Sequence, residues 1–120
     1  MNESGLQLYK DIVDGLADLH EGVHRVWVME RGYPDTDDNK EINELLKILT
    51  PQQKQILAKM MEDSRSGGIH DTLVYLNDRM AIDGLRFTQD GVEVAHQPFD
   101  TELHYDWTCR RMGDDWPDEE

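Results

Sequence analysis

Apolar residues recur at helical spacing in the first quarter of the chain. From residue 6 to about residue 31 they fall three or four positions apart, at Tyr9, Ile12, Val13, Leu16, Leu19, Val23, Val26 and Trp27. At about 100° per residue these positions share one broad arc of a helix, and Asp11, Asp14 and Asp18 lie on the opposite arc. The pattern predicts one long amphipathic helix over residues 6–31.

Capping residues mark three further helices. Residues 37–39 (Asp-Asp-Asn) offer N-caps for a helix that ends at Thr50. Thr50-Pro51-Gln52-Gln53 then supplies an N-cap, a proline at the first helical position and a glutamine at the third, which is the pattern of a capping box. We expect Gly67-Gly68 to end this third helix and a fourth helix to run from about Ile69 to Met80.

Beyond residue 84 the period changes from helical to alternating. Residues 85–94 alternate apolar and polar side chains around Asp90-Gly91, a strong short-range signal for a β-hairpin with a type I′ turn. Asp100 or Thr101 is expected to cap a last helix that ends at Gly113. The chain is therefore expected to have an α+β fold, a mostly helical bundle with one hairpin. We expect a single domain over residues 1–113 and an acidic tail over residues 114–120.

Acidic residues outnumber basic ones by 26 to 12, which gives a formal net charge of −14. Such a charge disfavours direct binding to nucleic-acid phosphates or anionic membranes and favours a basic partner. The excess is densest at the C-terminal end, where residues 98–120 hold eight acids and two bases. This segment is therefore the first place to look for a binding surface.

The cysteine content and the N-terminus indicate a cytoplasmic protein. Cys109 is the single cysteine, so no disulfide forms within the chain. The first residues lack a signal-peptide pattern, and no stretch approaches the 18 apolar residues of a membrane span.

A zinc-protease motif, H-E-x-x-H, is spelled by His20-Glu21-Gly22-Val23-His24. On a helix the two histidines would lie one turn apart and ligate zinc, with Glu21 as the general base. His70 or His104 would have to supply the third ligand, although neither has a diagnostic spacing from His24. This pattern defines an alternative function, a metal-dependent hydrolase with zinc as its cofactor.

The preferred interpretation of these histidines is structural. Two histidines at the edge of an apolar helix face are more often hydrogen-bonded core residues than ligands, and a five-residue motif recurs by chance. No strand pattern precedes the helix to bind a peptide substrate. We therefore expect a non-enzymatic protein without a cofactor.

Two segments carry a resemblance to a known family. Gly67-Gly68-Ile69-His70-Asp71 and the segment Tyr105-Asp106-Trp107-Thr108-Cys109-Arg110-Arg111, within residues 98–117, resemble a family of small bacterial proteins of unknown function. The resemblance extends over about residues 50–117. It implies a bacterial origin and a single domain, and no activity or functional residue.

The C-terminal segment combines aromatic residues with charge, the composition of many binding hot spots. We expect an interaction surface there, formed by Asp100, Glu102, Tyr105, Asp114, Asp115 and Trp116. The preferred function is an acidic protein-interaction module, of the immunity or accessory kind, that binds a basic partner protein. A nucleic-acid mimic that presents carboxylates to a basic groove is a second alternative.

Overall fold

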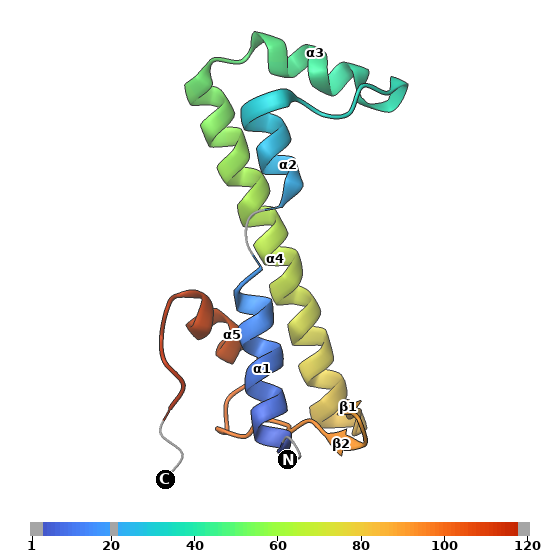
Figure 1. The fold of residues 1–120 in the computed structure, drawn as a ribbon, viewed down its shortest axis with the longest axis vertical. Coiled ribbons are helices and arrows are strands. Elements are labelled where there is room, and N and C mark those ends of the chain that lie inside the picture. Colours follow the sequence, from blue (N-terminus) through green and yellow to red (C-terminus); the bar gives the residue numbers. More distant parts are fainter. Residues whose placement is uncertain (1–3, 20–21, 118–120) are drawn as a thin grey trace. The chain divides into compact units, whose positions relative to one another are not determined.

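The computed structural model describes residues 4–19 and 22–117 (Figure 1). These residues form two compact units. The terminal unit comprises residues 4–19 and 69–117, and the inserted unit comprises residues 22–68. The fold is mostly helical, with one two-stranded antiparallel hairpin, as the sequence predicts.

The first helix is shorter than predicted. α1 spans Gly5–Ala17 and begins at Ser4, whose side chain accepts a hydrogen bond from the Gln7 N–H at 3.0 Å. The backbone of Gly22 is extended, with φ −73° and ψ 160°, and α2 (Val23–Val26) starts only after it. The expectation of one helix over residues 6–31 is therefore wrong, because Gly22 caps a second helix inside the predicted span.

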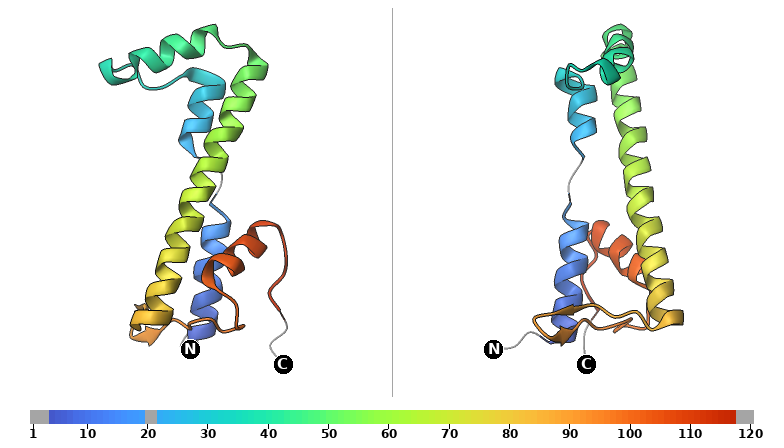
Figure 2. Two further views of the ribbon diagram at one scale, coloured as in Figure 1. Left: turned by 180° about the vertical axis from the view of Figure 1, so that it is seen from behind. Right: turned by 90° about the vertical axis from the view of Figure 1, so that its right-hand side faces the viewer.

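The inserted unit is built from short helical segments around the N-terminal part of α4. α2 continues into a π-helical turn, η1 (Trp27–Arg31), and a 3-10 turn, η2 (Asp37–Asn39), precedes α3 (Lys40–Ile48). α2 lies alongside the first turns of α4, and α3 crosses both (Figures 1 and 2). Val28, Leu46 and Ala58 form the buried core, with Leu57 and Met61 of α4 packed against it.

The long helix α4 (Pro51–Asp83) contributes to both units. Its start confirms the predicted capping box: Thr50 Oγ1 accepts from the Gln53 N–H at 3.1 Å, and Gln53 Oε1 accepts from the Thr50 N–H at 2.9 Å. The helix does not end at Gly67-Gly68, so the two predicted helices are one. Each glycine costs about 1 kcal/mol relative to alanine, and the apolar side chains that α4 buries in both units outweigh this cost.

The hairpin is confirmed, with a shorter regular pairing than predicted. β1 (Thr88–Gln89) pairs with β2 (Val92–Glu93), and Thr88 lies opposite Glu93. Asp90 (φ +50°) and Gly91 (φ +81°) both adopt the left-handed conformation that a type I′ turn requires. The Val94 N–H donates to the Phe87 carbonyl at 2.8 Å, which extends the ladder by one bond.

The last helix, α5 (Leu103–Arg111), lies between α1 and the C-terminal part of α4 (Figure 2). The core of the terminal unit forms where these three helices and the segment after β2 meet. Its buried members are Leu8, Tyr9, Val13, Leu73, Val94, Leu103 and Trp107. Trp107 is only 2% exposed, so the last helix is fixed on its neighbours by an aromatic anchor.

The two glycines inside α4 generate a stability prediction. A Cβ added at Gly67 or Gly68 meets no atom within 4 Å outside the helix's own backbone. Gly67→Ala and Gly68→Ala should therefore each raise the free energy of unfolding by about 0.5–1 kcal/mol, measured by urea denaturation. Gly5→Ala is the contrasting control, since its Cβ would lie 2.5 Å from the Glu93 carbonyl oxygen and should destabilise. A loss of stability in both α4 variants would contradict a continuous helix.

Candidate functional site

A buried carboxylate holds α5 on α1. Asp106 is only 3% exposed, and both of its oxygens accept hydrogen bonds. The Tyr9 hydroxyl donates to Oδ2 at 2.5 Å, and the Thr101 hydroxyl donates to Oδ1 at 2.5 Å. Because a buried carboxylate without donors is costly, this pairing fixes how α5 is rotated about its axis.

The same contact changes the acidity of Tyr9. Burial of the phenol raises the pKa of Tyr9 well above its ordinary value, and the hydrogen bond to Asp106 and the charge of that carboxylate raise it further. The folded chain therefore keeps Tyr9 protonated and able to donate. This hydroxyl serves as a structural donor.

The start of α5 is held by α4. The Leu103 N–H donates to Asn77 Oδ1 at 3.0 Å, and Asn77 is 3% exposed. Glu102 occupies the N-cap position without a side-chain capping bond, and Thr101 binds Asp106 instead. The predicted caps at Asp100 or Thr101 are thus replaced by an asparagine from another helix.

Both arginines of α5 lie over tryptophan rings. The Arg110 guanidinium carbon is 4.2 Å from the centre of the Trp116 ring, and that of Arg111 is 4.8 Å from the centre of the Trp107 ring. Cation–π contacts of this kind hold the positively charged guanidinium groups against the faces of the tryptophan rings. Arg110 is half-buried and Arg111 is exposed, whereas Asp106, the acid of α5, is buried.

Trp116 packs on the terminal unit. Its Nε1–H donates to Asp14 Oδ1 at 2.9 Å, its ring stacks on Phe99 at 5.4 Å between centroids, and its ring meets the edge of Tyr9 at 5.9 Å. Because Arg110 also lies over the ring, four residues contact the indole. The start of the predicted tail is thereby anchored to α1 through residue 116.

One face of α5 presents large side chains to solvent. Tyr105 is 54% exposed and Met112 is 77% exposed, and seven residues on a helix bring two side chains to nearly the same angle. Glu102 and Asp114, both exposed, flank this pair along the chain. We call Tyr105 of α5, its cap residues Glu102 and Met112, and Asp114, two residues beyond the C-cap, the α5 outer face.

An acidic hollow lies beside Trp116. It encloses about 320 Å³ and is lined by four aspartates, with Arg110 as its one base. Asp18, Asp114 and Asp115 are exposed, whereas Asp14 is partly buried and bonded to the indole. The hollow therefore offers carboxylates to a cation from outside.

The predicted interaction residues divide into two groups. Five of them are exposed, namely Asp100, Glu102, Tyr105, Asp114 and Asp115. Trp116 is half-buried, and its contacts are internal. The prediction that these residues bind a partner stays a prediction, although their geometry shows that Trp116 differs in role from the others.

Part of the zinc motif lies outside the residues that the structure describes. His20 and Glu21 are not described, and Gly22, the next residue, has an extended backbone before α2. His24 lies in α2 and contacts Trp27 and Tyr33, at 5.1 Å and 5.7 Å between ring centroids.

The other two histidines of the zinc alternative meet in the terminal unit. The rings of His70 and His104 lie 5.3 Å apart, edge to face, and His70 also approaches Trp107. Within residues 4–19 and 22–117, no group of three or more His, Cys, Asp or Glu side chains is arranged to hold a metal ion.

Sequence reasoning missed Asp106 as the structural centre of this region. A signal was present: Asp106 stands three residues after Leu103 and next to Trp107, so it belongs to the apolar face of the last helix. A carboxylate at such a position indicates a buried hydrogen-bonded acceptor.

Comparison with known proteins identifies the family of the chain. A family model described as "Family of unknown function (DUF6547)" matches residues 2–118, and the chain belongs to this family. No curated protein and no solved structure matches it. Among the helices that the structure describes, none is long and apolar enough to cross a membrane.

The raised pKa of Tyr9 predicts a specific loss of stability in alkali. The unfolded chain releases the phenolic proton above about pH 10, whereas the folded chain retains it, so the free energy of unfolding should fall by about 1.4 kcal/mol per pH unit there. Tyr9→Phe should be less stable at pH 7 by about 1–3 kcal/mol and should lack this part of the alkaline slope. Urea denaturation between pH 7 and 11 measures both effects.

The exposed Tyr75 offers the matched control for this experiment, since it is 58% exposed and does not touch Asp106. Tyr75→Phe should retain the wild-type slope. Identical slopes in wild type and Tyr9→Phe would contradict the burial of the Tyr9 hydroxyl against Asp106.

The packing of Trp116 predicts that the tail is structural. Trp116→Ala removes the contacts with Tyr9, Phe99 and Arg110, and we expect it to lower the thermal midpoint by about 5 °C or more in calorimetry. Asp115→Asn changes an exposed neighbour and should leave the midpoint nearly unchanged. An unaltered midpoint for Trp116→Ala would instead leave the indole available to a partner.

Proposed function

We propose that this chain is a non-enzymatic module that binds a basic partner protein through the α5 outer face. The observation that carries the proposal is the exposure of Tyr105 on α5 and of Met112 at its C-cap, with exposed carboxylates before and after them in the chain. Tyrosine is enriched among binding hot spots, and methionine adapts to varied apolar surfaces. Neither side chain is needed by the core of the terminal unit.

The charge of the chain supports a basic partner and is unequally divided. Residues 21–68 hold nine acids and seven bases, a net of −2. The rest of the chain holds seventeen acids and five bases, a net of −12. The electrostatic field of such a negative charge accelerates association with a cationic surface and repels anionic surfaces.

The acidic hollow gives this surface a pocket for a basic side chain. Its exposed carboxylates, Asp18, Asp114 and Asp115, border a volume of about 320 Å³, and its own base, Arg110, lies over Trp116. A lysine or arginine of the partner would gain charge-assisted hydrogen bonds there. The α5 outer face would supply the apolar contacts beside it, through a shared residue, Asp114.

Capture from a lysate of the native cells tests this function. Tagged wild type and the double variant Tyr105→Ala/Met112→Ala are compared, and proteins retained by wild type are identified by mass spectrometry. The variant should lose most of the basic partner, because truncation of hot-spot residues costs 2 kcal/mol or more, about thirtyfold in affinity. Added salt should also weaken capture.

The chain offers a closely matched control. Tyr75 and Ile82 are likewise seven residues apart on a helix of the terminal unit, and they are 58% and 79% exposed. Tyr75→Ala/Ile82→Ala should capture the partner as wild type does. Equal capture by wild type and the α5 variant would refute the proposal, and so would a retained partner that is acidic.

The nucleic-acid mimic is distinguished in the same experiment. The partner of a mimic is a DNA-binding protein whose basic groove accepts either the mimic or DNA. Duplex DNA added to the lysate would then displace the partner, whereas a partner that recognises Tyr105 and Met112 should stay bound. We place this interaction in the cytoplasm because the chain has a single, unpaired cysteine, Cys109.

A further inference from the structure

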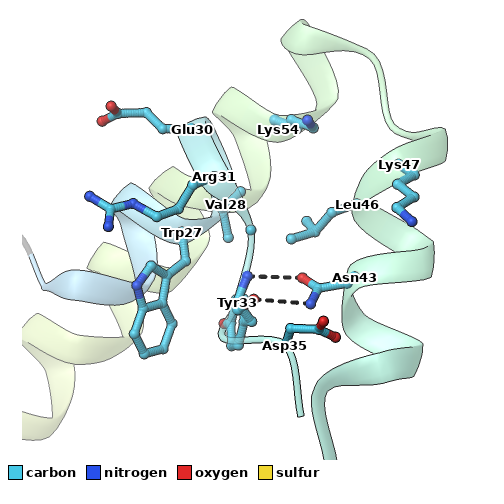
Figure 3. A pocket seen from close by; sticks show the side chains of 11 residues that line it. Trp27, Val28, Glu30, Arg31, Tyr33, Asp35, Asn43, Leu46, Lys47 and Lys54 are labelled. Carbon is cyan, nitrogen blue, oxygen red and sulfur yellow. Dashed lines mark hydrogen bonds between the residues drawn. The ribbon is translucent and has the colours of Figure 1, made fainter. Parts of the chain in front are cut away.

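A second site lies in the inserted unit and shares no residue with the surface just described. Its pocket encloses about 400 Å³, a size typical of small-molecule sites (Figure 3). One wall is η1, the opposite wall is α3, and Lys54 from the first turns of α4 lies at the upper edge. Tyr33 and Asp35 border it below, on the chain that connects the two walls.

The backbone of this pocket is rigidly held. The Asn43 side chain bonds to both backbone groups of Tyr33: its Oδ1 accepts from the N–H at 2.8 Å and its Nδ2 donates to the carbonyl at 3.0 Å. Gly32 has φ +83°, and a Cβ there would lie 3.0 Å from Asn43 Oδ1. A close approach of two chain segments therefore depends on glycine at this position.

The π-helical turn places two of the pocket's side chains. The Gly32 N–H donates to the Trp27 carbonyl at 2.7 Å, five residues back, so Trp27 and Arg31 lie on a widened turn. Single π-helical turns occur frequently at functional sites. In this protein the π-helical turn forms one wall of the pocket.

The charge at the pocket is opposite in sign to that of the chain. Arg31, Lys47 and Lys54 line it against Glu30 and Asp35, an excess of one base. The acidic hollow beside Trp116, in contrast, has one base and four acids. Within the described part of the chain, none of these three cations has a carboxylate oxygen within 4.0 Å of its side-chain nitrogens.

Two aromatic rings line the pocket beside the apolar side chains of Val28 and Leu46. The Trp27 and Tyr33 rings lie 5.0 Å apart, tilted by 57°, and both are half-buried. His24 supports them from one side, in contact with each ring. A tilted pair of this kind provides a face on which a planar group stacks.

We infer that this pocket binds a small anion that carries a planar ring, an aromatic phosphate or an aromatic carboxylate. The ring packs on Trp27 and Tyr33, and the anionic group pairs with cations that line the pocket. Arg31 extends from η1 to the side on which Trp27 lies, and Lys54 of α4 and Lys47 of α3 lie on the other side of η1 (Figure 3). The site is independent of the proposed protein-binding face, which belongs to the other unit.

Calorimetric titration of the full chain with four probes tests this inference. 1-Naphthyl phosphate and 1-naphthoate combine a ring with an anion, 1-naphthol has the ring alone, and inorganic phosphate has the anion alone. At least one of the two combined probes should bind at least tenfold more tightly than naphthol and phosphate. The tighter of the two identifies the preferred anionic group.

Variants assign the binding to this pocket. Lys54→Gln and Arg31→Gln should each weaken the better probe, by about tenfold where the cation pairs with the anion directly. Lys59→Gln is the matched control: it removes a lysine from the same helix that is paired with Asp63, outside the pocket, and should leave affinity unchanged. Trp27→Leu should weaken the naphthyl probes.

Three results would overturn the inference. The first is no binding of either combined probe, and the second is equal binding of naphthol, which would leave no role for the cations. The third is an unchanged affinity in both Lys54→Gln and Arg31→Gln. These substitutions replace half-exposed or exposed side chains, and circular dichroism verifies that the variants are folded.

Discussion

The terminal unit depends on one buried carboxylate. Asp106 accepts hydrogen bonds from the hydroxyl groups of Tyr9 in α1 and of Thr101 before α5, and it is almost inaccessible to solvent. Such a group is tolerated in a core only when its hydrogen bonds are satisfied, so the position and rotation of α5 are tied to these donors. Asn77 of α4 fixes the start of the same helix.

This constraint decides what the surface of α5 contains. With Asp106 turned inward, Arg110 lies over Trp116 and Arg111 over Trp107, while Tyr105 and Met112 remain exposed. The two parts of the chain then differ in chemistry: residues 1–20 and 69–120 carry a net charge of −12, whereas residues 21–68 carry a net charge of −2 and form a pocket lined by one more base than acids. The proposed protein partner and the inferred small ligand follow from that difference.

Local signals in the sequence predicted local structure well. The hairpin at Asp90-Gly91 and the capping box at Thr50 depend on residues a few positions apart, and both are confirmed. The predictions that failed concern places where local preference and packing compete. Gly67-Gly68 stays helical because α4 buries apolar side chains both before and after these two residues. Gly22 caps the start of a second helix, although the apolar periodicity predicted that the first helix continues. The pocket in the inserted unit joins residues from three elements, and linear spacing carries no signal for such a cluster.

A double-mutant cycle between α1 and α5 tests the central role of Asp106 most directly. The free energies of unfolding of wild type, Tyr9→Phe, Asp106→Asn and the combined variant are measured by urea denaturation at pH 7. If the buried hydrogen bond organises the unit, the two changes should be coupled by about 1 kcal/mol or more. Effects that add to within about 0.3 kcal/mol would show that the two side chains act independently and would contradict the account.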